Sequence, residues 1–211
     1  MATKSSAASA TPRRILLYVG IVVGVGALLF AAFAMGDEAG PSVEEVAGSP
    51  EVTGEPLPPF PQNGDPAADP GLGEQAPVTT GTDFDGEPVS IGDHDAELIV
   101  FMASWCPACQ AELPELVEWL EAGGLPDGVE LVSVSTGLDD SAGNWPPQDW
   151  FEREGYDHPI IVDDADGSIA NAYGMSATPF WVLLRDGQVE ARFPGRLEME
   201  QVDQMAQTLV P

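Results

Sequence analysis

The sequence contains few of the residues that several kinds of function require. Its 211 residues include two cysteines, two histidines and seven lysine or arginine residues, against 35 acidic residues, for a formal charge of −28. Two cysteines exclude both a multiply cross-linked disulfide scaffold and an iron–sulfur cluster held by four thiolates. So few cations exclude nucleic acid as a partner, because no surface could neutralise the phosphates. The acid excess indicates a halophilic or otherwise highly solvated surface, or an amino-acid composition that is general to the proteins of the source genome.

One long apolar run lies near the N-terminus. Ile15 to Met35 are 21 consecutive residues without a charge, long enough for one helix to cross a bilayer. Arg13 and Arg14 precede the run and acids follow it, which predicts a cytoplasmic N-terminus over residues 1–14. The sequence therefore predicts a single-pass cell-membrane protein with a transmembrane helix over 15–35 and an extracytoplasmic remainder. The alternative is a signal peptide cleaved near Ala34, which would make the protein secreted.

Residues 36–76 have the composition of a linker. The segment contains eight prolines and nine acids and shows neither helical nor strand periodicity. Prolines and like charges both extend a chain. We therefore expect an extended acidic tether between the membrane and a folded domain.

Residues 77–211 have the alternating pattern of one α/β domain. Short apolar runs predict strands, and amphipathic segments between them predict helices. Asp186-Gly187 between two of the runs predicts a hairpin. The expected strands are 98–103, 129–135, 159–162, 180–184 and 188–193, and the expected helices follow residue 106, cover 148–154 and 168–173, and close the chain around Val202, Met205, Ala206 and Leu209. This order predicts a mixed sheet covered on both sides.

Both cysteines lie in one motif, Trp105-Cys106-Pro107-Ala108-Cys109, between a predicted strand and a predicted helix. Cys106 would lie at the helix N-terminus, where unpaired N–H groups and the helix dipole stabilise a thiolate. Cys109, one turn further along, would face inward and attack a mixed disulfide formed at Cys106. The spacing predicts a redox-active Cys106–Cys109 pair that needs no further cofactor.

Two other uses of the cysteines have less support. A structural disulfide across so short a loop would stabilise the fold little. A zinc site would need two further ligands, and the two histidines, His94 and His158, lie on separate segments. We therefore expect no metal site.

Four motifs together resemble the thioredoxin superfamily, and within it the membrane-anchored TlpA/ResA-like thiol-disulfide oxidoreductases. The motifs are Asp85-Gly86-Glu87-Pro88-Val89, Ala103-Ser104-Trp105-Cys106-Pro107-Ala108-Cys109, Glu112-Leu113-Pro114 and Ala177-Thr178-Pro179-Phe180. The resemblance extends from about Gln75 to the C-terminus. It implies an α/β thioredoxin fold, with a mixed central sheet flanked by helices, that exchanges disulfides with protein substrates.

The resemblance also implies roles outside the cysteine pair. Pro179 would be the cis-proline beside the disulfide, and with Thr178 and Trp105 it would shape the groove for the substrate chain. A trans-proline at a strand start is the alternative. In similar proteins a glutamate at the position of Glu112, three residues after Cys109, helps to move the proton of the buried cysteine. A solvated surface glutamate is the alternative there.

One position departs from the pattern of similar proteins, and another argues against a peroxiredoxin. Thioredoxins carry an acid six residues before the first cysteine and many TlpA-like proteins carry Asn, whereas this chain has Val100. A proton relay through that position is therefore absent, which increases the reliance on Glu112. A peroxiredoxin would need Thr or Ser three residues before its nucleophile, where this chain has Ala103.

Proteins that this chain resembles usually act as reductases. They keep the haem-ligand cysteines of apocytochrome c, or other exported thiols, reduced, with electrons from a membrane partner. We therefore expect exported protein thiols or disulfides as substrates and an electron-transfer partner in the membrane. The alternatives are an oxidase that introduces disulfides into exported proteins and, from outside the enzymes, a redox-inert tethered interaction domain.

Overall fold

The structure is a computed structural model that describes residues 40–61 and 64–210. The described residues belong to one compact unit that begins at Gly40. The predicted cytoplasmic segment 1–14 and transmembrane helix 15–35 lie outside the described residues. Within the described ranges, no helix has both the length and the apolar character needed to cross a membrane.

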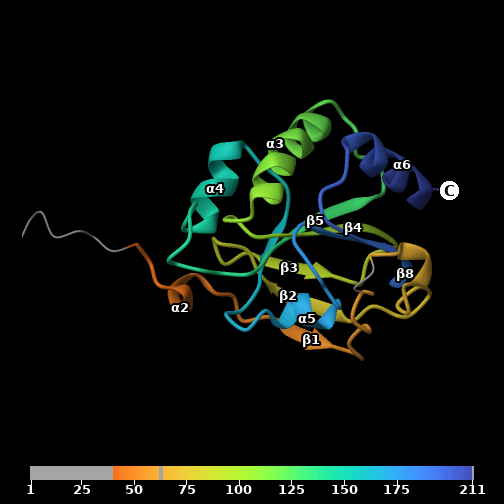
Figure 1. Cartoon of the computed structure of the whole chain (residues 1–211), viewed down its shortest axis with the longest axis horizontal. Helices are drawn as coiled ribbons and strands as arrows, with labels where there is room; N and C mark the ends of the chain where they lie inside the picture. Colours follow the sequence, from red (N-terminus) through yellow and green to blue (C-terminus); the bar gives the residue numbers. More distant parts are fainter. Residues whose placement is uncertain (1–39, 62–63, 211) are drawn as a thin grey trace, which may run out of the picture. The chain divides into compact units, whose positions relative to one another are not determined.

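A five-stranded mixed sheet forms the centre of the unit, in the order β6-β5-β4-β7-β8 (Figure 1). Strand β4 pairs in parallel with β5 and antiparallel with β7, while β5 pairs in parallel with β6 and β7 antiparallel with β8. The strands are β4 (Ala96–Met102), β5 (Glu130–Ser135), β6 (Ile160–Val162), β7 (Phe180–Arg185) and β8 (Gln188–Pro194). These bounds agree with the predicted strands to within two residues, and the mixed thioredoxin-like sheet is confirmed.

Helices cover both faces of this sheet, as the sequence predicted (Figure 1). One face packs against α3 (Pro107–Glu121), α4 (Pro147–Glu154) and α6 (Met199–Leu209), and the other packs against α5 (Ser168–Ala172). Strand β4 is buried along its whole length because its side chains alternate between the two cores. Val100 points into the core beneath α3, and its neighbour Phe101 points into the core beside α5.

The segment predicted as a linker is largely part of the fold, which corrects the sequence-based boundary at residue 77. Within residues 40–61 and 64–76 the chain forms α2 (Val43–Val46), β1 (Glu51–Thr53) and the 3-10 helix η1 (Pro66–Ala68). Strand β1 continues an antiparallel sheet with β2 (Val78–Thr82) and β3 (Pro88–Ile91). The described domain therefore begins near Gly40.

Apolar anchors explain why this proline-rich segment is ordered. Leu57 and Phe60 are buried in the core beside α5, where the Phe60 ring meets Phe180 edge-on. A buried ion pair follows, in which the Arg192 guanidinium of β8 donates to both carboxylate oxygens of Asp69. The isolated apolar residues gave no periodic pattern, so the sequence analysis missed this packing.

Candidate active site

The two cysteines lie where β4 ends and α3 begins. Cys106 is the N-cap residue of α3, with an extended backbone, and Pro107 occupies the first helical position. Proline suits that position because its fixed φ is already helical and its missing N–H would have no partner there. The Cys106 N–H donates to the Ala103 carbonyl at 3.0 Å, which closes the turn between strand and helix. Both cysteines are free thiols.

Cys106 is the more accessible of the two thiols, with 8% of the residue exposed. Its Sγ donates to the Thr178 carbonyl at 3.4 Å, across from the cis Thr178–Pro179 bond. Burial opposes ionisation, but hydrogen bonding from the Thr178 side chain, from the backbone and thiol of Cys109 and from the Ala108 backbone outweighs it, so the pKa of Cys106 is lowered. The cis bond agrees with what the resemblance implies.

Cys109 has the opposite environment. It is fully buried on the inner side of α3. Burial raises the pKa of its thiol far above the ordinary value, and the neighbouring Cys106 and Glu112 raise it further. This sulfur needs a base close by before it can attack as a thiolate.

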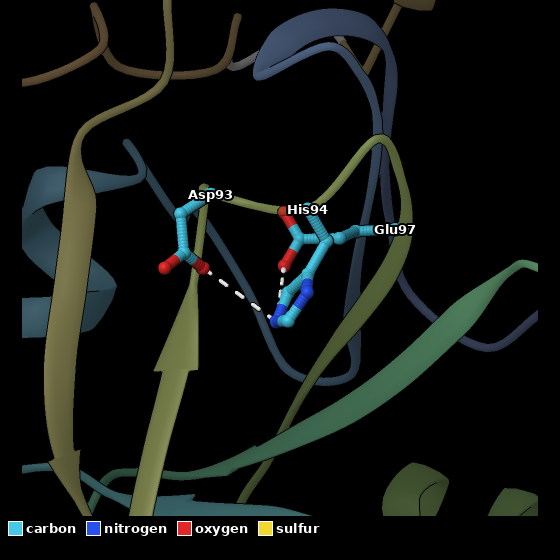
Figure 2. A group of neighbouring side chains, drawn as sticks. All are labelled: Asp93, His94 and Glu97. Carbon is cyan, nitrogen blue, oxygen red and sulfur yellow. Dashed lines mark ion pairs between the residues drawn. The ribbon is translucent and has the colours of Figure 1, made fainter.

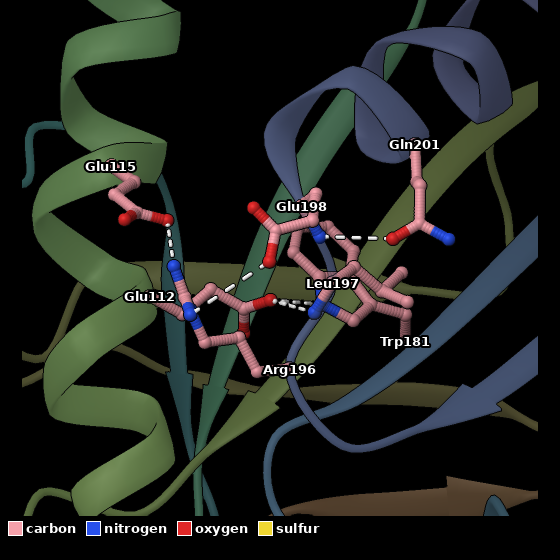
Figure 3. Close-up of polar contacts among 7 residues, drawn as sticks. All are labelled: Glu112, Glu115, Trp181, Arg196, Leu197, Glu198 and Gln201. Atoms are coloured by element: carbon pink, nitrogen blue, oxygen red, sulfur yellow. Dashed lines mark hydrogen bonds and ion pairs between the residues drawn. The ribbon is translucent and has the colours of Figure 1, made fainter.

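Glu112 is a buried carboxylate one turn along the helix from Cys109. Its Oε1 accepts from the Leu197 N–H at 2.7 Å and from the Trp181 indole N–H at 3.2 Å (Figure 3). Its Oε2 is buried without a hydrogen-bond partner among the described residues. Burial raises the pKa of Glu112 to about 7, although both donors and Arg196 act to lower it. The alternative of a solvated surface glutamate is therefore wrong.

Trp105 borders the thiols and has 42% of its surface exposed. Its indole N–H donates to the Gly137 carbonyl at 2.6 Å, which joins it to the loop after β5. Asn144 of the same loop donates to the Ser104 carbonyl at 3.0 Å, and Gln110 of α3 donates to that oxygen at 2.8 Å. The irregular segment between β5 and α4 therefore holds the backbone directly before the cysteine motif.

The sequence analysis missed three contributors to this site: Trp181, the Leu197 N–H and Asn144. Trp181 on β7 lies directly opposite Val100 on β4, and both face the core beneath α3. The strand next to β4 thus supplies an indole N–H that donates to the buried Glu112. The pairing of Trp181 with Val100 follows from the strand register, which the sequence does not show. The position of Trp181 two residues after the predicted cis-proline was the signal that could have found it.

One further cluster of described residues contains types that bind metals, from the turn before β4 and the start of that strand (Figure 2). His94 Nε2 lies 3.5 Å from Asp93 Oδ1 and 3.9 Å from Glu97 Oε1. Both Glu97 oxygens accept from the Gly92 N–H, at 3.1 and 2.8 Å. The cluster lies at the opposite end of β4 from Cys106, and ordinary ion pairing and hydrogen bonding account for its contacts.

Comparison with known proteins places this site in a family. The sequence profile of the AhpC/TSA family matches residues 72–192. Thiol-disulfide oxidoreductase ResA of Geobacillus kaustophilus is 26% identical over 143 residues, which cover 66% of this chain and 79% of that protein. Sporulation thiol-disulfide oxidoreductase A of Bacillus subtilis is 28% identical over 121 residues, which cover 56% of this chain and 72% of that protein.

A solved structure gives the same result. The crystal structure of StoA from Bacillus subtilis superimposes with a TM-score of 0.53 at 27% identity, covering 64% of this chain and 98% of that chain. The family match over residues 72–192 contains Cys106, Cys109 and Pro179. The chain therefore belongs to the AhpC/TSA family, within the thioredoxin superfamily, and is a thiol-disulfide oxidoreductase.

Proposed function

We propose that the domain exchanges disulfides with extracytoplasmic proteins through Cys106 and Cys109, in the direction of substrate reduction. The observation that supports the exchange chemistry, though not its direction, most directly is the contrast between the two thiols. Cys106 lies at a helix N-terminus with a lowered pKa, whereas Cys109 is buried beside a carboxylate whose pKa is raised to about 7. An attacking thiol and a resolving thiol need these two environments.

The reaction transfers two electrons to the substrate. The Cys106 thiolate attacks one sulfur of the substrate disulfide, forming a mixed disulfide and releasing one substrate thiolate. Glu112 Oε2 then accepts the Cys109 proton, and the Cys109 thiolate attacks Cys106 Sγ. The second substrate thiolate leaves, and the Cys106–Cys109 disulfide remains to be reduced by a dithiol donor.

Trp105, Thr178 and Pro179 are proposed to guide the substrate chain. The Thr178 carbonyl lies against Cys106 Sγ, and Trp105 is exposed beside the same sulfur-bearing turn. An extended substrate segment would pair with backbone groups at the cis-proline while its disulfide approaches Cys106. A transmembrane helix over residues 15–35, a membrane electron donor and apocytochrome c as one substrate complete the proposal.

The reduction potential of the full chain tests the direction of the reaction. The protein is equilibrated with defined thiol–disulfide buffers, and the Cys106–Cys109 couple is quantified by alkylation. A potential near about −270 mV or lower supports a reductase, because thioredoxin lies there. A potential near about −120 mV, typical of a strong oxidant, would support an oxidase instead, a direction that the lowered pKa of Cys106 favours by stabilising the reduced form.

Cysteine variants test the assignment of roles. Cys106→Ser should abolish disulfide exchange, while Cys109→Ser should accumulate a mixed disulfide with the substrate, which mass spectrometry detects. Unchanged exchange in Cys106→Ser would overturn the mechanism. The absence of any reversible couple in the wild type would instead favour a redox-inert interaction domain.

A further inference from the structure

Arg196 joins the loop between β8 and α6 to helix α3. Its guanidinium, about one-third exposed, pairs with Glu115 on α3 and lies 3.9 Å from Glu198 Oε1 (Figure 3). Glu115 lies three residues after Glu112 on the helix, and Leu197, the residue after Arg196, donates its N–H to Glu112 Oε1. The ion pair therefore lies beside the hydrogen bond that holds the carboxylate of the site.

Cations are scarce in this protein, and the described residues contain four arginines and no lysine. Arg192 pairs with Asp69. Arg185 contacts Glu190 and the end of α6, and Arg153 contacts Asn144 and Glu154. Arg196 is the one cation in the described ranges that lowers the pKa of Glu112. The Glu115 carboxylate acts against it and raises that pKa.

Building on the proposed function, we propose that Arg196 and Glu115 are positioning residues whose opposed charges set the pH range over which Glu112 accepts the Cys109 proton. Neither residue touches the reacting sulfurs. Arg196 stabilises the charged carboxylate, which has given up its proton, and Glu115 stabilises the neutral carboxyl group. The free Oε2 of Glu112 is the atom on which the two effects act.

The groups that face Glu112 come from three elements. Helix α3 contributes Cys109 and Glu115, and strand β7 contributes the neutral Trp181 indole. The loop before α6 contributes Arg196 together with the Leu197 N–H. Glu198 affects Glu112 indirectly, because it pairs with Arg196. Among these, Arg196 and Glu115 are the charged groups outside the exchange reaction whose removal changes the charge around Glu112.

The two partners give a test that separates charge from structure. Arg196→Gln and Glu115→Gln break the same ion pair, so loss of the structural link alone would change both variants alike. Loss of the Arg196 charge should instead move the titration of Glu112 to higher pH, and loss of the Glu115 charge should move it to lower pH. Each shift is expected to be about half a pH unit, as for one partly solvent-screened charge.

The readout is the resolving step alone. The reduced full chain is mixed with 5,5′-dithiobis(2-nitrobenzoate): attack by Cys106 releases the first coloured thiolate, and attack by Cys109 releases the second. The pH dependence of the second phase reports proton transfer to Glu112, and infrared absorption of its protonated carboxyl group gives the titration directly. Opposite shifts in the two variants support the inference, whereas shifts in the same direction, or none, overturn it.

Two controls complete the design. Glu190→Gln removes one acid and breaks the exposed Arg185–Glu190 pair far from the thiols, so it should leave the second-phase profile unchanged. Glu112→Gln distinguishes the proposed role of Glu112 from the proposed effect of the ion pair. If it leaves the profile unchanged, the proposed role of Glu112 fails. If it changes the profile while the Arg196 and Glu115 variants do not, only the inference about the ion pair fails.

Discussion

The two oxygens of Glu112 differ in their surroundings, and this difference determines which oxygen can take up a proton. Oε1 accepts two hydrogen bonds, which fix the carboxylate, whereas the buried Oε2 accepts none from the described residues. A buried oxygen without a donor has a high affinity for a proton. The residue thus combines a fixed position with an acceptor that is matched to neutral pH.

Glu112→Gln should slow the resolving step and, in alkaline solution, make the folded state more stable. Glutamine keeps an acceptor for the Leu197 N–H but cannot take the Cys109 proton, so the resolving step at pH 7 should slow by about 100-fold. Burial of an ionised Glu112 destabilises the fold above its raised pKa, and the substitution removes that cost. Stopped-flow kinetics and urea unfolding at pH 8 measure the two effects; a variant slower but less stable would contradict the raised pKa.

Glu97 should affect stability in the same direction without affecting activity. Burial raises its pKa from 4.5 to about 7, so the folded state binds the proton more tightly than the unfolded state. Stability is therefore lost as the pH rises from about 4.5 through about 7. Glu97→Gln should gain about 3 kcal/mol at pH 8 and little at pH 4. Urea unfolding at both pH values tests this, and an equal effect at both would contradict it.

At the scale of elements, the sequence was informative where side chains repeat periodically. The strands of the large sheet, helix α3 and the β7–β8 hairpin were predictable because apolar residues mark their buried faces. The segment around Leu57 and Phe60 was not, because two isolated apolar residues between prolines are buried by partners distant in the chain. The Leu197 N–H was also unpredictable, since a backbone donor leaves no trace in the choice of residue.

The pair between η1 and β8 should be required for the N-terminal segment to stay packed. Asp69→Asn would leave the buried Arg192 guanidinium with neutral partners alone, the introduced amide and the Tyr173 carbonyl, at a cost of about 3–5 kcal/mol. Urea unfolding gives the loss of stability, and hydrogen exchange shows whether residues 57–74 open first. Glu190→Gln at the exposed Arg185 pair is the matched control, with an expected loss below about 1 kcal/mol. Equal losses in both variants would contradict the structural role of the buried pair.

At the scale of the whole molecule, acidic charge dominates the electrostatics. The full chain carries 35 acids against seven lysine or arginine residues, and the domain has only four arginines with which to offset them. Each of these arginines joins segments or helix ends, and the partly exposed pairs with Glu115, Glu154, Glu190 and Glu198 are screened by salt. Repulsion among the acids is therefore the larger salt-sensitive contribution.

Thermal stability should rise with ionic strength. Raising the sodium chloride concentration to about 1 M shortens the screening distance to about 3 Å and weakens repulsion between acids. The buried Arg192–Asp69 pair is largely protected from this screening. Scanning calorimetry of the full chain tests the prediction; a Tm that falls with added salt would show that the arginine pairs outweigh the repulsion.

The hydrogen bond from Leu197 to Glu112 also has a consequence for biosynthesis. The cysteine motif is complete once the ribosome has passed residue 109, but one of the two donors that fix Glu112 Oε1 lies 85 residues after that glutamate, at the entrance to α6. A nascent or truncated chain that ends before Leu197 has both thiols and the Trp181 donor but lacks the second hydrogen bond that fixes Glu112 Oε1. The position of Glu112 is therefore fixed completely only when the segment that leads into the C-terminal helix has docked, long after both cysteines have been synthesised.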